Sequence, residues 1–138
     1  MDEKPILVLV VEDFGPFREF VRSSLQTALP LAEIFEACDG LRGVSMVQQL
    51  RPDLIVLDIG LPELNGLEAA RRIREIAPQS KILFLTQEKS PEVVREAFRI
   101  GACCYVVKTD AAGELDKAVL AAMRGTRYLS RSASHLED

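Results

Sequence analysis

Short apolar runs alternate with longer amphipathic segments from one end of this 138-residue chain to the other. Most of the runs are rich in Val, Ile and Leu and apolar nearly throughout, which is typical of strands covered on both faces. They span residues 6–11, 33–37, 54–57, 81–85 and 104–107. We expect each run to form a β-strand and most of these strands to be covered on both faces.

The segments between these runs repeat their apolar side chains every third or fourth residue, which predicts amphipathic helices. Asn65 with Glu68, and Ser90 with Pro91, are typical helix starts, and Gly125 is a typical stop. The apolar positions of the five predicted helices are Phe17, Val21, Leu25 and Leu29; Leu41, Val44, Val47 and Leu50; Leu67, Ala70, Ile73 and Ala77; Val94, Ala97 and Phe98; and Leu115, Ala118, Val119, Ala122 and Met123.

Five strands alternating with five helices predict a single α/β domain. The expected architecture is a doubly wound, flavodoxin-like three-layer sandwich with a parallel five-stranded sheet in the order 2-1-3-4-5. In such sheets the functional site lies beyond the carboxyl ends of the strands, where the strand order reverses. We expect the domain to span residues 1–125 and the polar residues 126–138 to form a C-terminal tail or the start of a linker.

The net charge, the length of the apolar runs and the cysteine spacing indicate which partners and which compartment to expect. The net charge of -4, without a clustered excess of Lys and Arg, argues against nucleic-acid binding by this segment. No secretory leader opens the chain, and no apolar run is long enough to span a membrane. Three cysteines without a CxxC spacing predict reduced thiols that pack as small buried apolar side chains. We therefore expect a cytoplasmic protein.

Polar residues follow four of the five predicted strands. The first strand is followed by Glu12 and Asp13, the third by Asp58, the fourth by Thr86 and the fifth by Lys108. Because parallel strands end at one edge of a sheet, these side chains are expected to meet there. Each also has an ordinary alternative: Asp13 as a helix cap, Glu12 as a solvated loop charge, Thr86 as a turn residue and Lys108 as a surface cation.

Three neighbouring carboxylates repel one another unless a cation lies among them. Oxygen ligands without His or Cys favour Mg²⁺, or Mn²⁺. Asp58, placed between such a metal and Lys108, is suited to attack a phosphoryl group that the Thr86 hydroxyl also binds. Gly60 leaves its backbone carbonyl available as a metal ligand, whereas Gly66 is interpreted as a turn residue.

Four segments, LVVEDFGPFR, DLIVLDIGLPELNG, ILFLTQ and GACCYVVKTD, together resemble the receiver domains of bacterial response regulators in two-component signalling. The resemblance extends from about residue 6 to residue 124. The segments GACCYVVKTDAAGEL and GTRYLS are similar to receivers that precede a helix-turn-helix DNA-binding output domain. The resemblance therefore implies transcription regulation through a domain outside this chain.

The family's pattern implies a phosphoacceptor and its metal site. Asp58 would accept the phosphoryl group from a histidine kinase or a phosphotransfer protein. Mg²⁺ would be bound by Asp13, Asp58 and the carbonyl of Gly60, with Glu12 assisting directly or through water. Such a receiver is not an enzyme acting on other molecules, because it catalyses only its own phosphorylation and slow dephosphorylation. The partners that the resemblance allows also include a second copy of the chain, in a homodimer.

The same pattern assigns the remaining site residues. Thr86 and Lys108 would bind the phosphoryl group, and Thr86 and Tyr105 would form the conformational switch. Gln87 and Glu88 are expected to modulate hydrolysis, since Gln87 stands where the family usually has a small residue. In addition, the lysine is usually followed by proline, whereas threonine follows it here.

Other functions remain open from the sequence. A phosphatase of the haloacid dehalogenase type would also use an Asp nucleophile, but it expects a second Asp at the position of Gly60. A flavodoxin-like redox module would need a Ser- or Thr-rich loop after the first strand. A stand-alone adapter, or a binding module that has lost phosphorylation, would retain the receiver fold.

Overall fold

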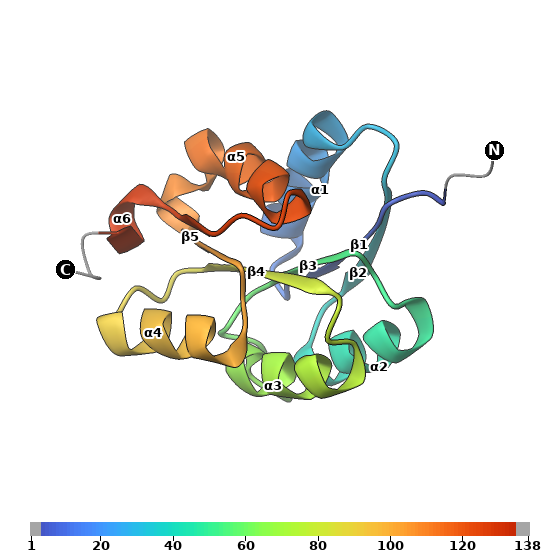
Figure 1. Cartoon of the computed structure of the whole chain (residues 1–138), viewed down its shortest axis with the longest axis horizontal. Coiled ribbons are helices and arrows are strands. Elements are labelled where there is room, and N and C mark those ends of the chain that lie inside the picture. Colours follow the sequence, from blue (N-terminus) through green and yellow to red (C-terminus); the bar gives the residue numbers. More distant parts are fainter. Residues whose placement is uncertain (1–3, 135–138) are drawn as a thin grey trace.

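The computed structural model describes residues 4–134, which form a parallel sheet between two layers of helices (Figure 1). The strands are β1 (Leu7–Val11), β2 (Glu33–Ala37), β3 (Leu54–Leu57), β4 (Lys81–Thr86), β5 (Cys104–Val107) and β6 (Tyr128–Leu129). The helices are α1 (Gly15–Ala28), α2 (Gly40–Leu50), α3 (Gly66–Ile76), α4 (Pro91–Ile100), α5 (Ala111–Met123) and α6 (Arg131–Ser134), with the 3-10 turn η1 (Lys108–Asp110) between β5 and α5.

The sheet has the order β2-β1-β3-β4-β5-β6, and each neighbouring pair of strands is parallel. The predicted order of the first five strands is therefore confirmed, and β6 is an addition at the edge. Helices α1 and α5 cover one face, whereas α2, α3 and α4 cover the other (Figure 1). The order reverses between β1 and β3, so the carboxyl ends of these two strands lie side by side.

The core has one layer on each face of the sheet. Along β1, Val8 and Val10 pack in the layer under α1 and α5, whereas Leu9 and Val11 pack in the opposite layer. Successive strand residues point to opposite faces, so a strand covered on both sides must be apolar throughout. This explains the continuous apolar runs, and it fixes the carboxyl ends of the central strands in a rigid edge.

The predicted helix boundaries have the expected chemistry. Asn65 Oδ1 accepts a hydrogen bond from the Glu68 N–H at 3.1 Å at the start of α3. Ser90 Oγ accepts one from the Val93 N–H at 3.3 Å at the start of α4. After α5, Gly125 has a φ of +74°, a conformation that favours glycine. These three predictions are confirmed.

The predicted apolar stripe of α2 is only partly correct. Leu41 is 48% exposed, whereas Gly40 and Gly43 face the interior. A Cβ at Gly43 would lie 3.0 Å from Val11, so the glycine lets α2 approach β1 closely. Side chains spaced by three residues rotate around a helix with 3.6 residues per turn, which carries Leu41 out to solvent.

The cysteines differ in burial. Cys104 is buried and Cys103 is partly buried, but Cys38, which follows β2, is exposed. The prediction that each thiol is a buried apolar side chain is therefore wrong for Cys38. All three are free cysteines.

The segment after α5 returns to the sheet. Tyr128 and Leu129 pair in parallel with Cys104 and Tyr105, and the short helix α6 follows. Residues 135–138 of the predicted tail lie outside the described residues. Where the domain ends and a linker begins stays a prediction.

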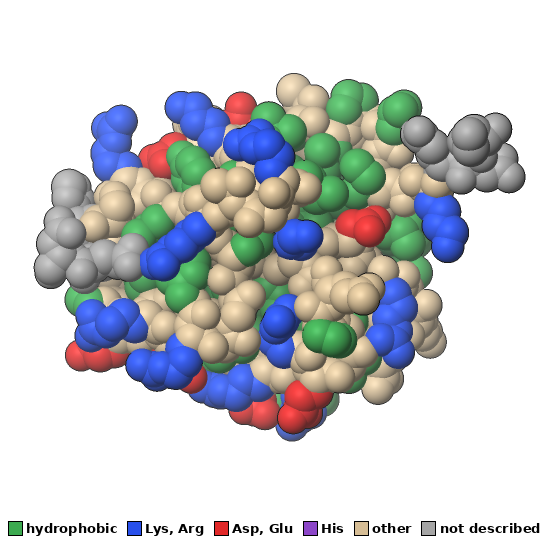
Figure 2. All heavy atoms as spheres, in the orientation of Figure 1, with side chains coloured by type: hydrophobic (Ala, Val, Ile, Leu, Met, Phe, Trp, Pro, Cys, Tyr) green, Lys and Arg blue, Asp and Glu red, His purple; other side chains and the backbone are tan. Residues whose placement is uncertain are grey.

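The face shown in Figure 2 carries Lys and Arg side chains interspersed with acidic, polar and hydrophobic ones. The basic groups on this face therefore do not merge into one continuous patch. Within residues 4–134, no helix combines the length and the apolar character that crossing a bilayer requires.

Candidate functional site

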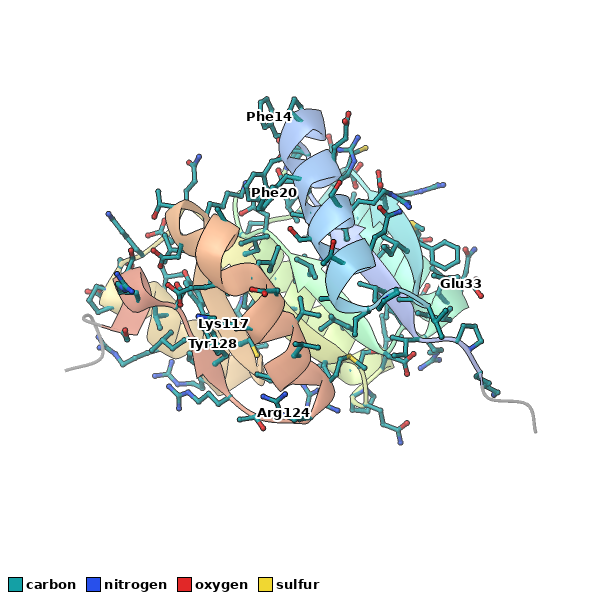
Figure 3. All side chains as sticks on the ribbon, turned by 90° about the horizontal axis from the view of Figure 1, so that it is seen from above. Phe14, Phe20, Glu33, Lys117, Arg124 and Tyr128 are labelled. Atoms are coloured by element: carbon teal, nitrogen blue, oxygen red, sulfur yellow. The ribbon has the colours of Figure 1, made fainter. Side chains whose placement is uncertain are left out.

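A pocket of about 340 Å³ lies at the carboxyl edge of the sheet, where the sequence predicted the site. The view in Figure 3 shows Phe14, which lines this pocket, at one end of α1, and Arg124 at the opposite end of the molecule. The lining residues are Glu12, Asp13, Phe14, Asp58, Ile59, Gly60, Thr86, Gln87, Glu88 and Lys108. The fold thus brings together every predicted site residue except Tyr105.

Three carboxylates meet in this pocket. Glu12, Asp13 and Asp58 each offer an oxygen atom, and these atoms all lie within 4.8 Å of one another. Glu12 and Asp58 are buried, so Glu12 is not the solvated loop charge of the ordinary alternative. Asp13 is exposed, and the residue that caps α1 is Phe14 rather than Asp13.

Lys108 joins two of these carboxylates. Its Nζ donates to Asp58 Oδ2 at 3.0 Å and lies 2.8 Å from Glu12 Oε1. The ammonium also lies 4.7 Å from the centre of the Phe17 ring, a favourable cation–π distance. Burial by itself would lower the pKa of Lys108, but hydrogen bonds to Glu12 and Asp58 outweigh it and raise the pKa. Lys108 is therefore a fixed positive charge in the site and not a free surface cation.

For Glu12, burial has the largest effect on the pKa. Burial raises its pKa, and although hydrogen bonds from Lys108 and the Phe14 N–H lower it, the net direction is upward. The neighbouring charge of Asp58 adds to this rise. The negative charge on Glu12 thus costs free energy that a cation among the carboxylates would recover.

The loop after β3 fixes the Asp58 side chain. The Ile59 N–H donates to Asp58 Oδ1 at 2.7 Å, and the Gly60 N–H donates to the same atom at 3.4 Å. Asp58 itself donates its N–H to the Val11 carbonyl at 3.1 Å, which ties the carboxylate to the end of β1. One carboxylate oxygen is therefore held by backbone N–H groups and the other by Lys108.

Gly66 packs directly against the backbone of Asp58. A Cβ at Gly66 would lie 2.0 Å from the Asp58 carbonyl oxygen and 2.7 Å from the Ile59 Cα. The φ of Gly66 is not positive, so turn conformation does not demand a glycine there. The interpretation of Gly66 as a turn residue is wrong, because what it provides is space. At Gly60, by contrast, a Cβ would meet nothing within 4 Å.

Thr86 and Tyr105 each form a hydrogen bond with the backbone of Glu88. Thr86 is buried at the end of β4, and its Oγ1 accepts a hydrogen bond from the Glu88 N–H at 3.3 Å. The Tyr105 hydroxyl donates to the Glu88 carbonyl at 2.6 Å, and its ring is fully buried. Tyr105 therefore lies behind the pocket wall and contacts the loop that Thr86 also contacts. Gln87 and Glu88 are exposed at the pocket rim.

The chain contains two tyrosines and no tryptophan, so alkaline titration reports on both tyrosines directly. Burial raises the pKa of Tyr105, and burial with a hydrogen bond to Glu114 raises the pKa of Tyr128 to about 12. Unfolded tyrosines titrate near pH 10. Because both folded pKa values are raised, the stability that the protonated tyrosines contribute is complete below about pH 10 and is lost as pH rises through the raised values.

We expect the ultraviolet absorbance of tyrosinate to change little near pH 10 in the folded protein and to change fully there in denaturant. Tyr128→Phe leaves Tyr105 alone and isolates its titration. A half-complete absorbance change near pH 10 in the folded protein would contradict the described environment of the two phenols.

The donor set suits Mg²⁺. The described cluster consists of carboxylate oxygens, and the exposure of Asp13 leaves room for the water ligands that this ion retains. When all are ionised, three carboxylates and one ammonium leave two negative charges, which a divalent cation balances. The residues present therefore fit the predicted metal.

The comparisons with known proteins agree with this site. Residues 8–120 match the family described as the response regulator receiver domain. The chain belongs to this family of two-component signalling receivers. The match excludes the phosphatase and the flavodoxin-like redox module as alternatives, and the predicted resemblance is confirmed.

Relatives within the family include transcription regulators. The chain is 34% identical over 91% of its length to the uncharacterized transcriptional regulatory protein YxjL of Bacillus subtilis. It is 30% identical over 95% of its length to the nitrate/nitrite response regulator protein NarL of Escherichia coli. The chain spans 57% of the former protein and 61% of the latter.

A solved relative has nearly the same fold. The crystal structure of a two-component response regulator of the LuxR family from an Aurantimonas species has a TM-score of 0.88 and 29% identity. The alignment covers 96% of this chain and 94% of that one. The fold class predicted from the sequence is thus confirmed independently.

Two contributions to the site escaped the sequence analysis. Phe17 was assigned only to the apolar face of a helix, yet its ring lies against the Lys108 ammonium. Ile59 was given no role, yet its N–H holds Asp58 Oδ1. A backbone donor has no sequence signal of its own. The position of Phe17, one residue after Pro16 in the first turn of α1, was the only hint that it lies near the strand ends.

Proposed function

We propose that this chain accepts a phosphoryl group on Asp58 from the phosphohistidine of a histidine kinase or phosphotransfer protein. The observation that carries the proposal is the setting of Asp58. One of its oxygens accepts backbone N–H groups and the other accepts Lys108, and two further carboxylates lie beside it. Such a carboxylate is held in one orientation at the floor of an open pocket, as an attacking group must be.

The transfer exchanges one bond for another. A carboxylate oxygen of Asp58 forms a bond to phosphorus while the phosphorus–nitrogen bond to the histidine breaks, and the imidazole leaves with the bonding electrons. Asp13, Asp58 and the Gly60 carbonyl would hold Mg²⁺, with Glu12 assisting directly or through water. The metal supplies positive charge to the transferring oxygens.

Thr86 and Lys108 are proposed to bind the phosphoryl oxygens once the group is on Asp58. Both line the pocket, and Lys108 already contacts the acceptor carboxylate. Drawing the Thr86 hydroxyl toward the phosphoryl group would break its bond with the Glu88 N–H. Since Tyr105 donates to the Glu88 carbonyl, this loop movement is a direct route to the proposed switch residue.

Gln87 and Glu88 are proposed to set the rate of dephosphorylation. The acyl phosphate hydrolyses when water approaches in line with the bond to Asp58. Gln87 and Glu88 line the pocket and are exposed, which supports a role for their side chains in admitting or excluding that water. The domain thereby catalyses its own slow return to the resting state.

The output is proposed to be transcription regulation in the cytoplasm. The named relatives are transcription regulators and response regulators, and the chain spans little more than half their length. A DNA-binding portion would therefore lie outside this chain, and this segment would not bind nucleic acid itself. A homodimer formed on phosphorylation is part of the same proposal.

Acetyl phosphate tests the proposal without knowledge of the kinase. We expect the intact protein to gain the mass of one phosphoryl group in the presence of Mg²⁺, and none when the metal is removed with a chelator. The metal dependence follows from the two further carboxylates that lie beside the acceptor. An unchanged mass with Mg²⁺ would leave a phosphorylation-independent binding module as the function.

A further inference from the structure

The segment after α5 contributes a buried hydroxyl to the strand end that carries Lys108. Ser130, which follows β6, is fully buried. Its Oγ accepts a hydrogen bond from the Val107 N–H at 2.9 Å and donates to Asp110 Oδ2 at 2.7 Å. Val107 directly precedes Lys108, and Asp110 closes the turn η1 that Lys108 begins. Ser130 therefore links the backbone just before Lys108 to the Asp110 side chain that follows it.

The hydroxyl of Ser130 replaces a missing strand partner. The last pairing between β5 and β6 joins Tyr105 and Leu129, and the Ser130 N–H donates to the Tyr105 carbonyl. Beyond that point β6 has ended, and the Val107 N–H donates to the Ser130 side chain. A buried N–H without an acceptor is costly, so this bond stabilises the end of β5 in its observed position.

Two carboxylates hold Ser130 in place. Asp110 accepts hydrogen bonds from both the N–H and the hydroxyl of Ser132, each at 2.8 Å, and Glu114 accepts from the Arg131 N–H at 3.2 Å. Burial alone would raise the pKa of Asp110, but hydrogen bonds from Ser130 and Ser132 outweigh it and lower the pKa. Asp110 is thus an ionised acceptor that joins η1 to the first turn of α6.

We infer that Ser130 is a positioning residue for phosphoryl transfer, acting through Lys108. The inference rests on the proposed transfer to Asp58. The Lys108 ammonium contacts Asp58 and Glu12, and its stem starts from the backbone that the Ser130 bonds hold. A displaced backbone would therefore strain or lengthen both contacts. The segment after α5 is consequently part of the phosphorylation site, although it contacts none of the three carboxylates.

Ser130→Ala tests this role. At saturating acetyl phosphate and Mg²⁺, we expect phosphorylation about five-fold slower, the scale of one neutral hydrogen bond. Magnesium affinity measured by calorimetry should change less than in Asp13→Asn, because Ser130 reaches the proposed metal-binding residues only through Lys108. Ser134→Ala is the matched control, since Ser134 lies in the same segment, is exposed, and its hydroxyl donates locally to the Arg131 carbonyl. Alanine retains the N–H that donates to the Ser130 carbonyl. It should phosphorylate at the wild-type rate.

A double-mutant cycle separates positioning from general loosening of the fold. If Ser130 acts through Lys108, then adding Ser130→Ala to Lys108→Ala should slow phosphorylation no further. An equal slowing in both backgrounds, or a wild-type rate for folded Ser130→Ala, would overturn the inference. Should Ser130→Ala fail to fold, Asp110→Ala removes the acceptor of the Ser130 hydroxyl instead. This variant must also slow phosphorylation, and it must cause no further slowing in the Lys108→Ala background. A wild-type protein that gains no phosphoryl group would instead refute the proposed function.

Discussion

Asp58→Asn is expected to abolish phosphorylation of this chain by acetyl phosphate, even with saturating Mg²⁺. The amide retains the size of the carboxylate and can still accept the N–H groups of Ile59 and Gly60. It has no negative oxygen with which to attack phosphorus, and it no longer forms an ion pair with Lys108. Intact-protein mass spectrometry should show only the unmodified mass.

Two control variants show whether the loss of phosphorylation is specific to Asp58. Asp116→Asn makes the same chemical change at an exposed position of α5, away from the pocket lining, and should leave phosphorylation intact. Asp13→Asn keeps the acceptor but removes a proposed metal ligand. It should therefore raise the Mg²⁺ concentration needed for half-maximal phosphorylation. Stoichiometric phosphorylation of Asp58→Asn would show that another side chain is the acceptor.

Gly66→Ala is expected to destabilise the fold strongly and to slow phosphorylation. The new Cβ would lie 2.0 Å from the Asp58 carbonyl oxygen and 2.8 Å from its carbon, and neither backbone atom can move without shifting the loop. Overpacking against backbone costs about 3 kcal/mol, which lowers the melting temperature by about 10 °C. The displaced atoms belong to the proposed acceptor, so stability and phosphorylation should fall together.

Gly113→Ala is the matched control for this substitution. Gly113 lies within α5, and a Cβ there would meet nothing within 4 Å. Alanine in a helix is favoured over glycine by about 0.5–1 kcal/mol, so this variant should be slightly more stable than wild type. Thermal unfolding followed by circular dichroism measures both variants. Equal melting temperatures for Gly66→Ala and Gly113→Ala would contradict the close packing of α3 on the Asp58 backbone.

Local chemistry explains why so much of the fold was predictable. Strands β3 and β5 begin and end at the predicted residues, because a strand covered on both faces is marked by its own apolar side chains. The bounds of β2 were also predicted, although β2 is a partly buried edge strand with two glutamates. The starts of α3 and α4 were equally clear, since Asn65 and Ser90 accept hydrogen bonds from residues only three positions away. The strand order was predicted by precedent, since doubly wound folds with five strands and five helices commonly have it.

Residues distant in sequence were harder to predict. The position of β6 depends on an edge of β5 that exists only after the sheet has formed, and Tyr128 and Leu129 alone are too short to indicate a strand. Leu41 follows the same spacing as its buried neighbours but is exposed, because the position of α2 on the sheet decides which face is covered. The need for glycine at position 66 is visible only beside the Asp58 carbonyl.

The amino-acid sequence by itself determined the first five strands and the first five helices, the edge of the sheet where the polar residues meet, and the identity of Asp58 as the candidate acceptor. The tertiary structure alone decided that Lys108 also contacts Glu12 and that Ser130 bonds to the backbone next to Lys108. The physical reason is the distance along the sequence over which each kind of interaction acts. Side-chain periodicity and capping act within a few residues, whereas the bond between Val107 and Ser130 spans 23 positions and requires β6 to pair with β5 first.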